Sequence, residues 1–151
     1  MLKLGIIGIS EGNGHPYSWA SIFNGYSPDA MRSCEFPAIP QYLSERRWPE
    51  DRLVGAEVSH IWTQSKNSSK KIANASLIPN IVKNPQDMIG LVDGILLARD
   101  DAKNHFYYAR DFIEAGMPIY IDKPIALNKR DLDMLYNLEK YDGQIFSCSS
   151  L

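Results

Sequence analysis

Short, almost wholly apolar runs that alternate with helical segments constrain this sequence most strongly. The clearest run, VDGILLA at residues 92–98, has hardly any polar position, and such a strand is usually buried on both faces, as in a parallel sheet. Similar runs predict strands over residues 2–8, 56–64, 78–84, 92–98, 117–122 and 144–149. Because helices separate these strands, the connections are right-handed crossovers. The pattern therefore predicts an α/β fold with a doubly wound parallel sheet of about six strands.

Helix start and stop signals lie between the predicted strands. Asp101 is expected to cap a helix that Gly116 ends. Asn128 and Asp131 form a capping-box-like start to a last helix that we expect to stop near residues 142–143. We predict helical segments over residues 16–25, 65–76, 85–90, 102–116 and 128–142.

Residues 26–53 interrupt this regular alternation. Prolines at positions 28, 37, 40 and 49 exclude one continuous helix or a central strand. We interpret the segment as an excursion over the surface, with short helices near residues 29–33 and 41–46. It is long for a connecting loop, and loops of this length are often functional.

The 151 residues fit one domain, residues 1–151, large enough to bury a core. The net charge of −2 and the absence of a basic run argue against a nucleic-acid partner. No apolar run approaches the roughly 20 residues that span a bilayer, so we expect no membrane partner. Cys34 and Cys148 match no metal-ligand spacing, so we expect free thiols, no metal and a cytoplasmic location.

The first strand runs into a loop with three glycines, Gly8, Gly12 and Gly14. Backbone N–H groups at such a strand-to-helix turn can hold a pyrophosphate, and Ser10, Asn13 and His15 could donate further hydrogen bonds. No G-x-G-x-x-G pattern can be read, however, and Glu11 adds a negative charge. The residues alone leave two interpretations open, a nucleotide loop of unusual shape and a tight structural turn.

The second strand end, Thr63-Gln64-Ser65, lacks the acid that usually holds the ribose hydroxyls of NAD. If a cofactor binds, Ser65 and Lys66 would tolerate a 2′-phosphate better than an aspartate would. The end therefore leaves NAD and NADP both open, as well as an ordinary polar loop.

The other predicted strand ends carry Ala98-Arg99-Asp100 and Asp122-Lys123-Pro124. In a sheet of order 3-2-1-4-5-6, the Rossmann type, ligands bind at the carboxyl ends of the strands, where these residues would meet the glycine loop. Lys123 could orient a ligand hydroxyl or transfer a proton; the alternative is a surface Asp–Lys pair of at most about 1 kcal/mol. His105 lies one turn into the next helix, close to the same edge.

Residues 93–132 resemble the matching stretch of the Gfo/Idh/MocA oxidoreductases. That family has a strand, a polar loop, a helix with an early histidine, an apolar strand and then Glu-Lys-Pro. Here Asp122-Lys123-Pro124 is similar to the tripeptide, with aspartate for glutamate, and His105 matches the histidine. The unusual glycine loop, the missing acid and the long excursion depart from the family.

The resemblance implies an NAD- or NADP-binding domain of an enzyme that transfers a hydride between the nicotinamide and a sugar or polyol hydroxyl. Lys123 would be catalytic, residues 8–15 would hold the pyrophosphate, and residues 98–100 and 122–124 would flank the nicotinamide. The family's C-terminal substrate domain is absent from these 151 residues, so we expect the chain alone to be inactive. A stand-alone binding or interaction module is the alternative, and we expect a homo-oligomer.

Overall fold

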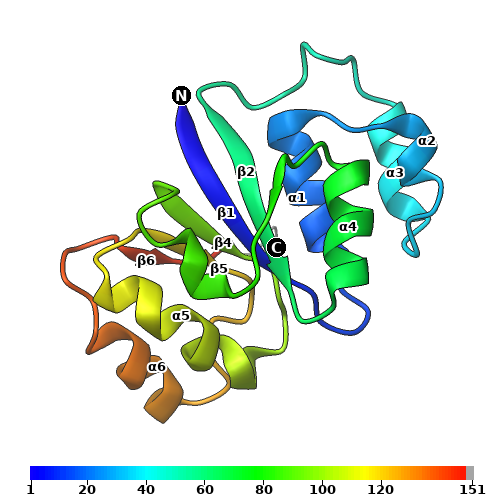
Figure 1. Ribbon diagram of the computed structural model, residues 1–151. Helices are drawn as coiled ribbons and strands as arrows, with labels where there is room; N and C mark the ends of the chain where they lie inside the picture. Colours follow the sequence, from blue (N-terminus) through cyan, green and yellow to red (C-terminus); the bar gives the residue numbers. More distant parts are fainter. Residues whose placement is uncertain (149–151) are drawn as a thin grey trace.

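The computed structural model, which describes residues 1–148, contains one six-stranded parallel sheet of order β3-β2-β1-β4-β5-β6 (Figure 1). The predicted doubly wound sheet and its strand order are thereby confirmed. The strands are β1 (Leu2–Gly8), β2 (Ala56–Thr63), β3 (Asn80–Ile81), β4 (Gly94–Leu97), β5 (Ile119–Ile121) and β6 (Ile145–Phe146).

The central strand β1 pairs with β2 on one side and with β4 on the other. The edge strands β3 and β6 have one neighbour each and are only two residues long. The predicted strands 78–84 and 144–149 are thus too long, and Ser149 lies outside the described residues. An edge strand gains hydrogen bonds from one side only, which favours short pairing.

Helices cover the sheet from both faces (Figure 1). On one face, α1 and α4 pack over β1 and β2, with α2 and α3 beyond them, whereas α5 and α6 cover the opposite face. The helices are α1 (His15–Asn24), α2 (Pro28–Met31), α3 (Ala38–Ser44), α4 (Lys66–Ala75), α5 (His105–Glu114) and α6 (Lys129–Tyr136), with 3₁₀ turns η1 (Pro85–Met88) and η2 (Ala102–Asn104).

The helix caps agree with the sequence in part. The Asn128 side chain accepts a hydrogen bond from the Asp131 N–H at 3.0 Å, as the capping-box pattern predicts. The last helix nevertheless ends at Tyr136, before the predicted stop. Asp101 occupies the N-cap position of the 3₁₀ turn η2 that precedes α5, but its side chain makes no capping hydrogen bond, since the carboxylate accepts from the Arg99 guanidinium and from Asn104.

The Pro-rich excursion is more than a surface loop, which corrects the sequence-based interpretation. It forms α2 and α3, near the two predicted short helices, and its side chains Met31, Ile39 and Leu43 are buried in the core on the α1 side. Phe36 and Ile39 also approach the glycine loop, as described below.

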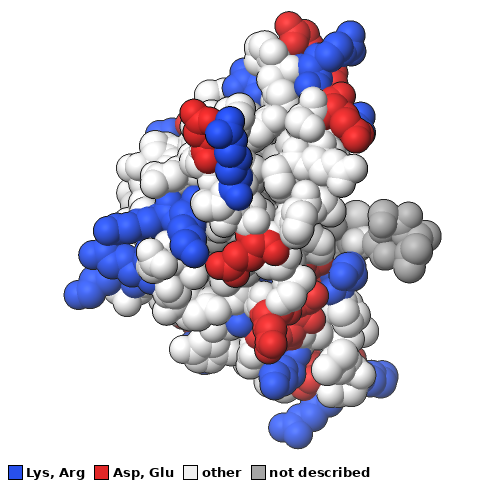
Figure 2. Space-filling view, turned by 90° about the vertical axis from the view of Figure 1, so that its right-hand side faces the viewer, with Lys and Arg blue, Asp and Glu red and all other residues white. Residues whose placement is uncertain are grey.

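Charged residues of both signs are interspersed on the face shown in Figure 2. Within residues 1–148, no helix is long and apolar enough to cross a membrane. Over the same residues, no group of three or more His, Cys, Asp or Glu side chains lies close enough together to hold a metal ion.

Candidate functional site

Hydrogen bonds join the four predicted strand ends at the carboxyl edge of the sheet. Ser10 reaches Asp100, where its hydroxyl donates to Oδ1 at 2.6 Å. The loop residues Asn13 and His15 reach Asp122. The Gln64 side chain pairs with the backbone of Ile9, accepting from its N–H at 3.0 Å and donating to its carbonyl at 2.6 Å. The topology therefore brings these predicted residues together.

Asp122 is the centre of this edge. Its side chain is only 2% exposed, and Oδ2 accepts from Asn13 Nδ2 at 2.9 Å and contacts His15 Nδ1 at 2.5 Å. Oδ1 accepts from the Lys123 N–H at 2.8 Å. Burial raises the pKa of the Asp122 carboxyl, but the hydrogen bonds from His15 and Asn13 outweigh it and leave the pKa below its usual value. Asp122 is therefore a buried carboxylate that fixes the glycine loop.

The His15 ring lies between this carboxylate and solvent. It stacks on Trp19 with the ring centroids 4.9 Å apart and the planes at 14°. Its side chain is 33% exposed, and no hydrogen-bond partner of Nε2 occurs within residues 1–148. The sequence alone did not indicate that Trp19 supports the His15 ring.

The glycines of the loop have different roles. A Cβ at Gly8 would lie 2.4 Å from Pro16 Cγ, and a Cβ at Gly14 would lie 2.6 Å from Ile39 Cδ1 and 2.7 Å from the Phe36 ring. These two glycines therefore allow close packing of the first helix and of the excursion. Gly12 faces open space and has a φ of +75°, which favours glycine.

The N-terminus of α1 offers few free donors. The His15 N–H donates to Asn13 Oδ1 at 2.8 Å, Pro16 has no N–H, and the Tyr17 N–H donates to the Gly14 carbonyl at 3.0 Å. In the described part of the chain, the N–H groups of Gly12 and Gly14 have no partner. Of these two, Gly12 is exposed, whereas Gly14, the N-cap of α1, is buried, so the loop presents the Gly12 N–H. Glu11 beside it is exposed.

Arg99 closes the space between the ends of β1, β2 and β4. Its Nη1 donates to the Ile9 carbonyl at 2.9 Å and to Gln64 Oε1 at 3.0 Å. Its Nε and Nη2 donate to both oxygens of Asp101 at 2.9 and 2.7 Å, and its Cζ lies 4.5 Å from the Tyr108 ring centroid. Arg99 is 6% exposed, so we assign it a structural role, in which it holds the ends of β1, β2 and β4 together.

Two residues at the β2 end are used within the protein. The buried Thr63 hydroxyl donates to the Ser65 carbonyl at 2.7 Å and contacts Ser69 Oγ at 2.9 Å. The Ser65 side chain caps α4 by accepting from the Ser68 N–H at 3.3 Å. Of the predicted Thr63-Gln64-Ser65 group, only the Gln64 side chain is exposed.

His105 is fully buried under the edge. Its Nε2 lies 2.6 Å from the Arg99 carbonyl oxygen and its Nδ1 3.0 Å from the Ile125 carbonyl oxygen. Both nitrogens are thus engaged by the backbone, and none is free for a ligand. His105 connects the segment after β4 to the segment that follows Lys123-Pro124.

Lys123 and Pro124 are exposed at the end of β5, whereas Ala98 is buried at the end of β4. No hydrogen bond or ion pair engages Lys123 Nζ within the described residues, and the surface Asp–Lys pair considered from the sequence is not formed. The ammonium group beside Asp122 is therefore available to a ligand.

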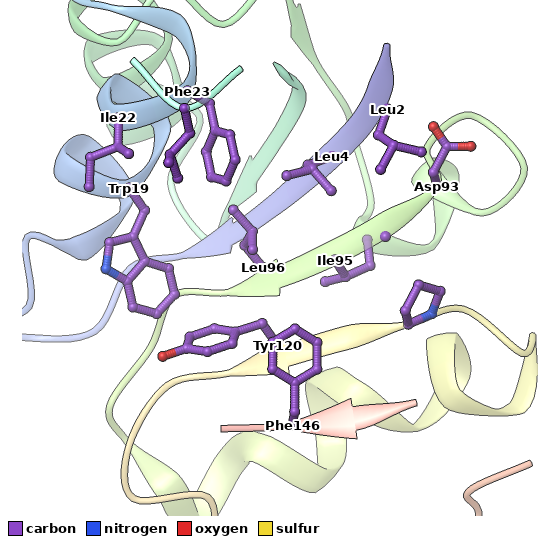
Figure 3. A pocket seen from close by; sticks show the side chains of 13 residues that line it. Leu2, Leu4, Trp19, Ile22, Phe23, Asp93, Ile95, Leu96, Tyr120 and Phe146 are labelled. Carbon is purple, nitrogen blue, oxygen red and sulfur yellow. The ribbon is translucent and has the colours of Figure 1, made fainter. Parts of the chain in front are cut away.

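A cavity of about 540 Å³ lies away from this edge, on the sheet face bordered by α1. Figure 3 shows that aromatic and aliphatic side chains point into it from α1, β1, β4, β5 and β6, among them Trp19, Phe23, Leu96, Tyr120 and Phe146. This cavity, called the apolar groove below, could not be predicted from the sequence. The spacing of Trp19, Ile22 and Phe23 on a helix also fits an ordinary core face.

The edge fits a nicotinamide dinucleotide by the chemistry of its donors. The exposed and unpartnered N–H of Gly12 suits a pyrophosphate. Two nearby carboxylates are engaged within the protein, since Asp122 accepts from Asn13 and Asp100 accepts from Ser10. Exposed Glu11, in contrast, adds a negative charge beside the loop.

Several solved structures share this fold. A probable dehydrogenase from Thermotoga maritima (17% identity, TM-score 0.64) matches 97% of this chain and 35% of its own. A Gfo/Idh/MocA family oxidoreductase from Vibrio cholerae (16%, 0.65) matches 98% and 38%, and myo-inositol 2-dehydrogenase from Lactobacillus plantarum (15%, 0.60) matches 91% and 32%. The chain thus spans about a third of these proteins' length.

No curated protein matches the sequence. A family model does match, however, over residues 37–150, and it describes an oxidoreductase family with an NAD-binding Rossmann fold. That range covers most of the 151 residues and ends beyond Asp122-Lys123-Pro124. The chain therefore belongs to the Gfo/Idh/MocA oxidoreductase family, of which it represents the NAD-binding Rossmann domain.

Proposed function

We propose that this domain binds NAD or NADP and serves hydride transfer between the nicotinamide and a hydroxyl of a sugar or polyol. The proposal rests on two features that lie at the same carboxyl edge, which Asp122 organises. The N–H groups of Gly12 and Gly14 have no partner in the described chain, and the Lys123 ammonium is free. When bound, the nicotinamide would supply the hydride acceptor or donor. The protein would bind, orient and exchange protons.

Each residue at the edge has a proposed role. The loop from Gly8 to His15 would contact the cofactor, with the Gly12 N–H donating to the pyrophosphate. Lys123 Nζ would donate to the substrate oxygen and assist its proton transfer. The other proposed cofactor neighbours are Ser10, Asn13, Thr63, Gln64, Ser65, Ala98, Arg99, Asp100, His105, Asp122 and Pro124; His105 would act only through the segments that it joins.

The β2 end bears on the choice between NAD and NADP. Gln64 is engaged by Ile9, and residues 63–66 include no carboxylate that could hold ribose hydroxyls. Lys66, exposed in the first turn of α4, would favour a 2′-phosphate. These features are consistent with NADP without excluding NAD.

The substrate class is supported by relatives whose names state it, such as myo-inositol 2-dehydrogenase and scyllo-inositol dehydrogenase. Since the chain spans about a third of these proteins, we propose that residues 1–151 alone show no turnover. The cytoplasmic location remains a sequence-based prediction.

A tryptophan-fluorescence titration with NADH and with NADPH tests the proposal. Trp19 stacks on His15 at the edge, so binding should quench emission and transfer energy to the reduced nicotinamide. ADP-ribose should compete, because it shares the pyrophosphate. Failure of both NADH and NADPH to bind at millimolar concentration would overturn the proposal.

The second candidate is a binding or interaction module without catalysis. It is favoured by the network in which Arg99 and Gln64 already bond to Ile9, which leaves fewer free groups for adenosine ribose. Absence of cofactor binding would favour this module. Size-exclusion chromatography tests the proposed homo-oligomer.

A further inference from the structure

The contacts of His15 go beyond what a loop-fixing role requires. Nδ1 contacts the buried Asp122 carboxylate at 2.5 Å, whereas Nε2 has no partner within residues 1–148. The stack on Trp19, with planes at 14°, fixes the orientation of the ring. One nitrogen is therefore held in place, and the other is left free at a partly exposed position.

The Asp122 carboxylate determines which nitrogen of the His15 ring carries the hydrogen. A carboxylate has no hydrogen to donate, so the shared hydrogen belongs on Nδ1 of the imidazole. A neutral ring in this tautomer has its lone pair on Nε2. Second partners that fix a histidine tautomer in this way are common where the outer nitrogen meets a ligand.

We propose that His15 is a hydroxyl-recognition residue of the carboxyl edge, whose Nε2 accepts a hydrogen bond from a ligand O–H, with Asp122 as its positioning residue. This inference rests on the proposed function. It adds that one hydrogen bond to the ligand is made by His15 Nε2, as the acceptor.

A hydroxyl fits this position better than an anion does. A lone pair on Nε2 repels phosphate or carboxylate oxygens, which also carry lone pairs. Lys123, whose N–H donates to the other oxygen of the same carboxylate at 2.8 Å, offers only donors on its ammonium. His15 Nε2 is an acceptor, the Lys123 ammonium is a donor, and both residues contact the Asp122 carboxylate. Together they match an alcohol oxygen, which donates one hydrogen bond and accepts others.

The hydroxyl could belong to the nicotinamide ribose or to a substrate polyol, since both offer the same O–H. Long-range ¹H–¹⁵N spectra of the histidine-labelled chain at pH 8 separate these sources. We expect His15 to carry its hydrogen on Nδ1. Movement of the Nε2 resonance with NADH alone assigns the ribose, and movement only after myo-inositol is added to the NADH complex assigns the polyol.

Variants give an independent measurement. His15→Phe keeps a ring to stack on Trp19 but removes both nitrogens, so the ligand that moves the resonance should bind about tenfold more weakly, the loss of roughly one hydrogen bond. His15→Gln keeps an acceptor oxygen and should lose less. His60→Gln, in the half-buried part of β2 away from the edge, is the matched control and should change neither affinity.

The outcomes distinguish this inference from the proposed function. If calorimetry shows that NADH binds while Nε2 stays unmoved in both arms, or if Nε2 carries a hydrogen at pH 8, the role of His15 is refuted and cofactor binding stands. If neither NADH nor NADPH binds, both proposals are overturned together.

Discussion

Replacing Asp122 by asparagine should destabilise the domain by an amount that its contacts allow us to work out. The carboxylate accepts three hydrogen bonds, from Asn13 and His15 on Oδ2 and from the Lys123 N–H on Oδ1. An asparagine has one acceptor oxygen. With that oxygen facing Asn13 and His15, the amide NH₂ would face the Lys123 N–H and leave it unpaired.

The cost has two parts. The unpaired Lys123 N–H is only partly buried and costs about 1 kcal/mol, the lower end for an unpaired donor. The two remaining hydrogen bonds lose the assistance of a full charge, which roughly halves their strength. We therefore expect Asp122→Asn to lower the free energy of unfolding by about 2–4 kcal/mol. With a urea slope near 2 kcal/mol per M, the midpoint should fall by about 1–2 M.

The assay is urea unfolding at pH 7, followed by circular dichroism and tryptophan fluorescence. Asp142→Asn is the matched control, because Asp142 is exposed and accepts no hydrogen bond within residues 1–148. A loss below about 0.5 kcal/mol for Asp122→Asn, the size of an ordinary surface substitution, would refute the reasoning.

The pH dependence follows from the lowered pKa of Asp122. A carboxyl whose pKa is lower in the folded than in the unfolded state stabilises the fold above its unfolded pKa of about 3.9, and this stabilisation is lost as the pH falls through the folded value. The difference in stability between the wild type and Asp122→Asn should thus shrink as the pH falls below about 4. A gap that stays the same or widens below pH 4 would contradict this assignment.

Three further substitutions test other parts of the account. Gly14→Ala should cost about 1–3 kcal/mol in urea unfolding because its Cβ would meet the Phe36 ring at 2.7 Å, and Phe36→Ala in the same chain should recover part of that loss. His105→Ala should lower the free energy of unfolding by roughly 2–4 kcal/mol, seen as a lower melting temperature, since the Arg99 and Ile125 carbonyls lose their contacts with the ring. Lys123→Met should leave stability within about 0.5 kcal/mol, because its ammonium has no partner in the described residues, yet abolish polyol binding to the NADH complex in calorimetry; Lys140→Met, which is also exposed, is its control.

The sheet could be predicted from the sequence because its signals are local. Apolar runs bounded by glycine and helix caps indicate strands and crossovers, and the handedness of crossovers restricts their order. The lengths of β3 and β6 could not be read in this way, because pairing at a sheet edge depends on a neighbour that the local pattern does not show. Likewise, burial of Met31 and Leu43 in the Pro-rich excursion depends on α1 and α4, which lie elsewhere in the chain.

The candidate site was predictable in its location but not in its contacts. Topology placed the strand ends at one edge, as the hydrogen bond from Ser10 to Asp100 confirms across 90 residues of sequence. Which side chains would be free was not predictable. His105 and Asp122 are buried and engaged in hydrogen bonds, whereas Lys123 and Gly12 are exposed, and these differences depend on packing between segments distant in the sequence.

The most direct test of the central claim is to follow the backbone amide resonances of the ¹⁵N-labelled chain while NADH, and separately NADPH, is added. The account predicts that the amides of Gly12 and Gly14, which have no partner in the described chain, show the largest shifts as one of these cofactors saturates the domain. Saturable binding that leaves these two amides unmoved and shifts instead the amides of Tyr120 and Phe146 in the apolar groove would contradict it.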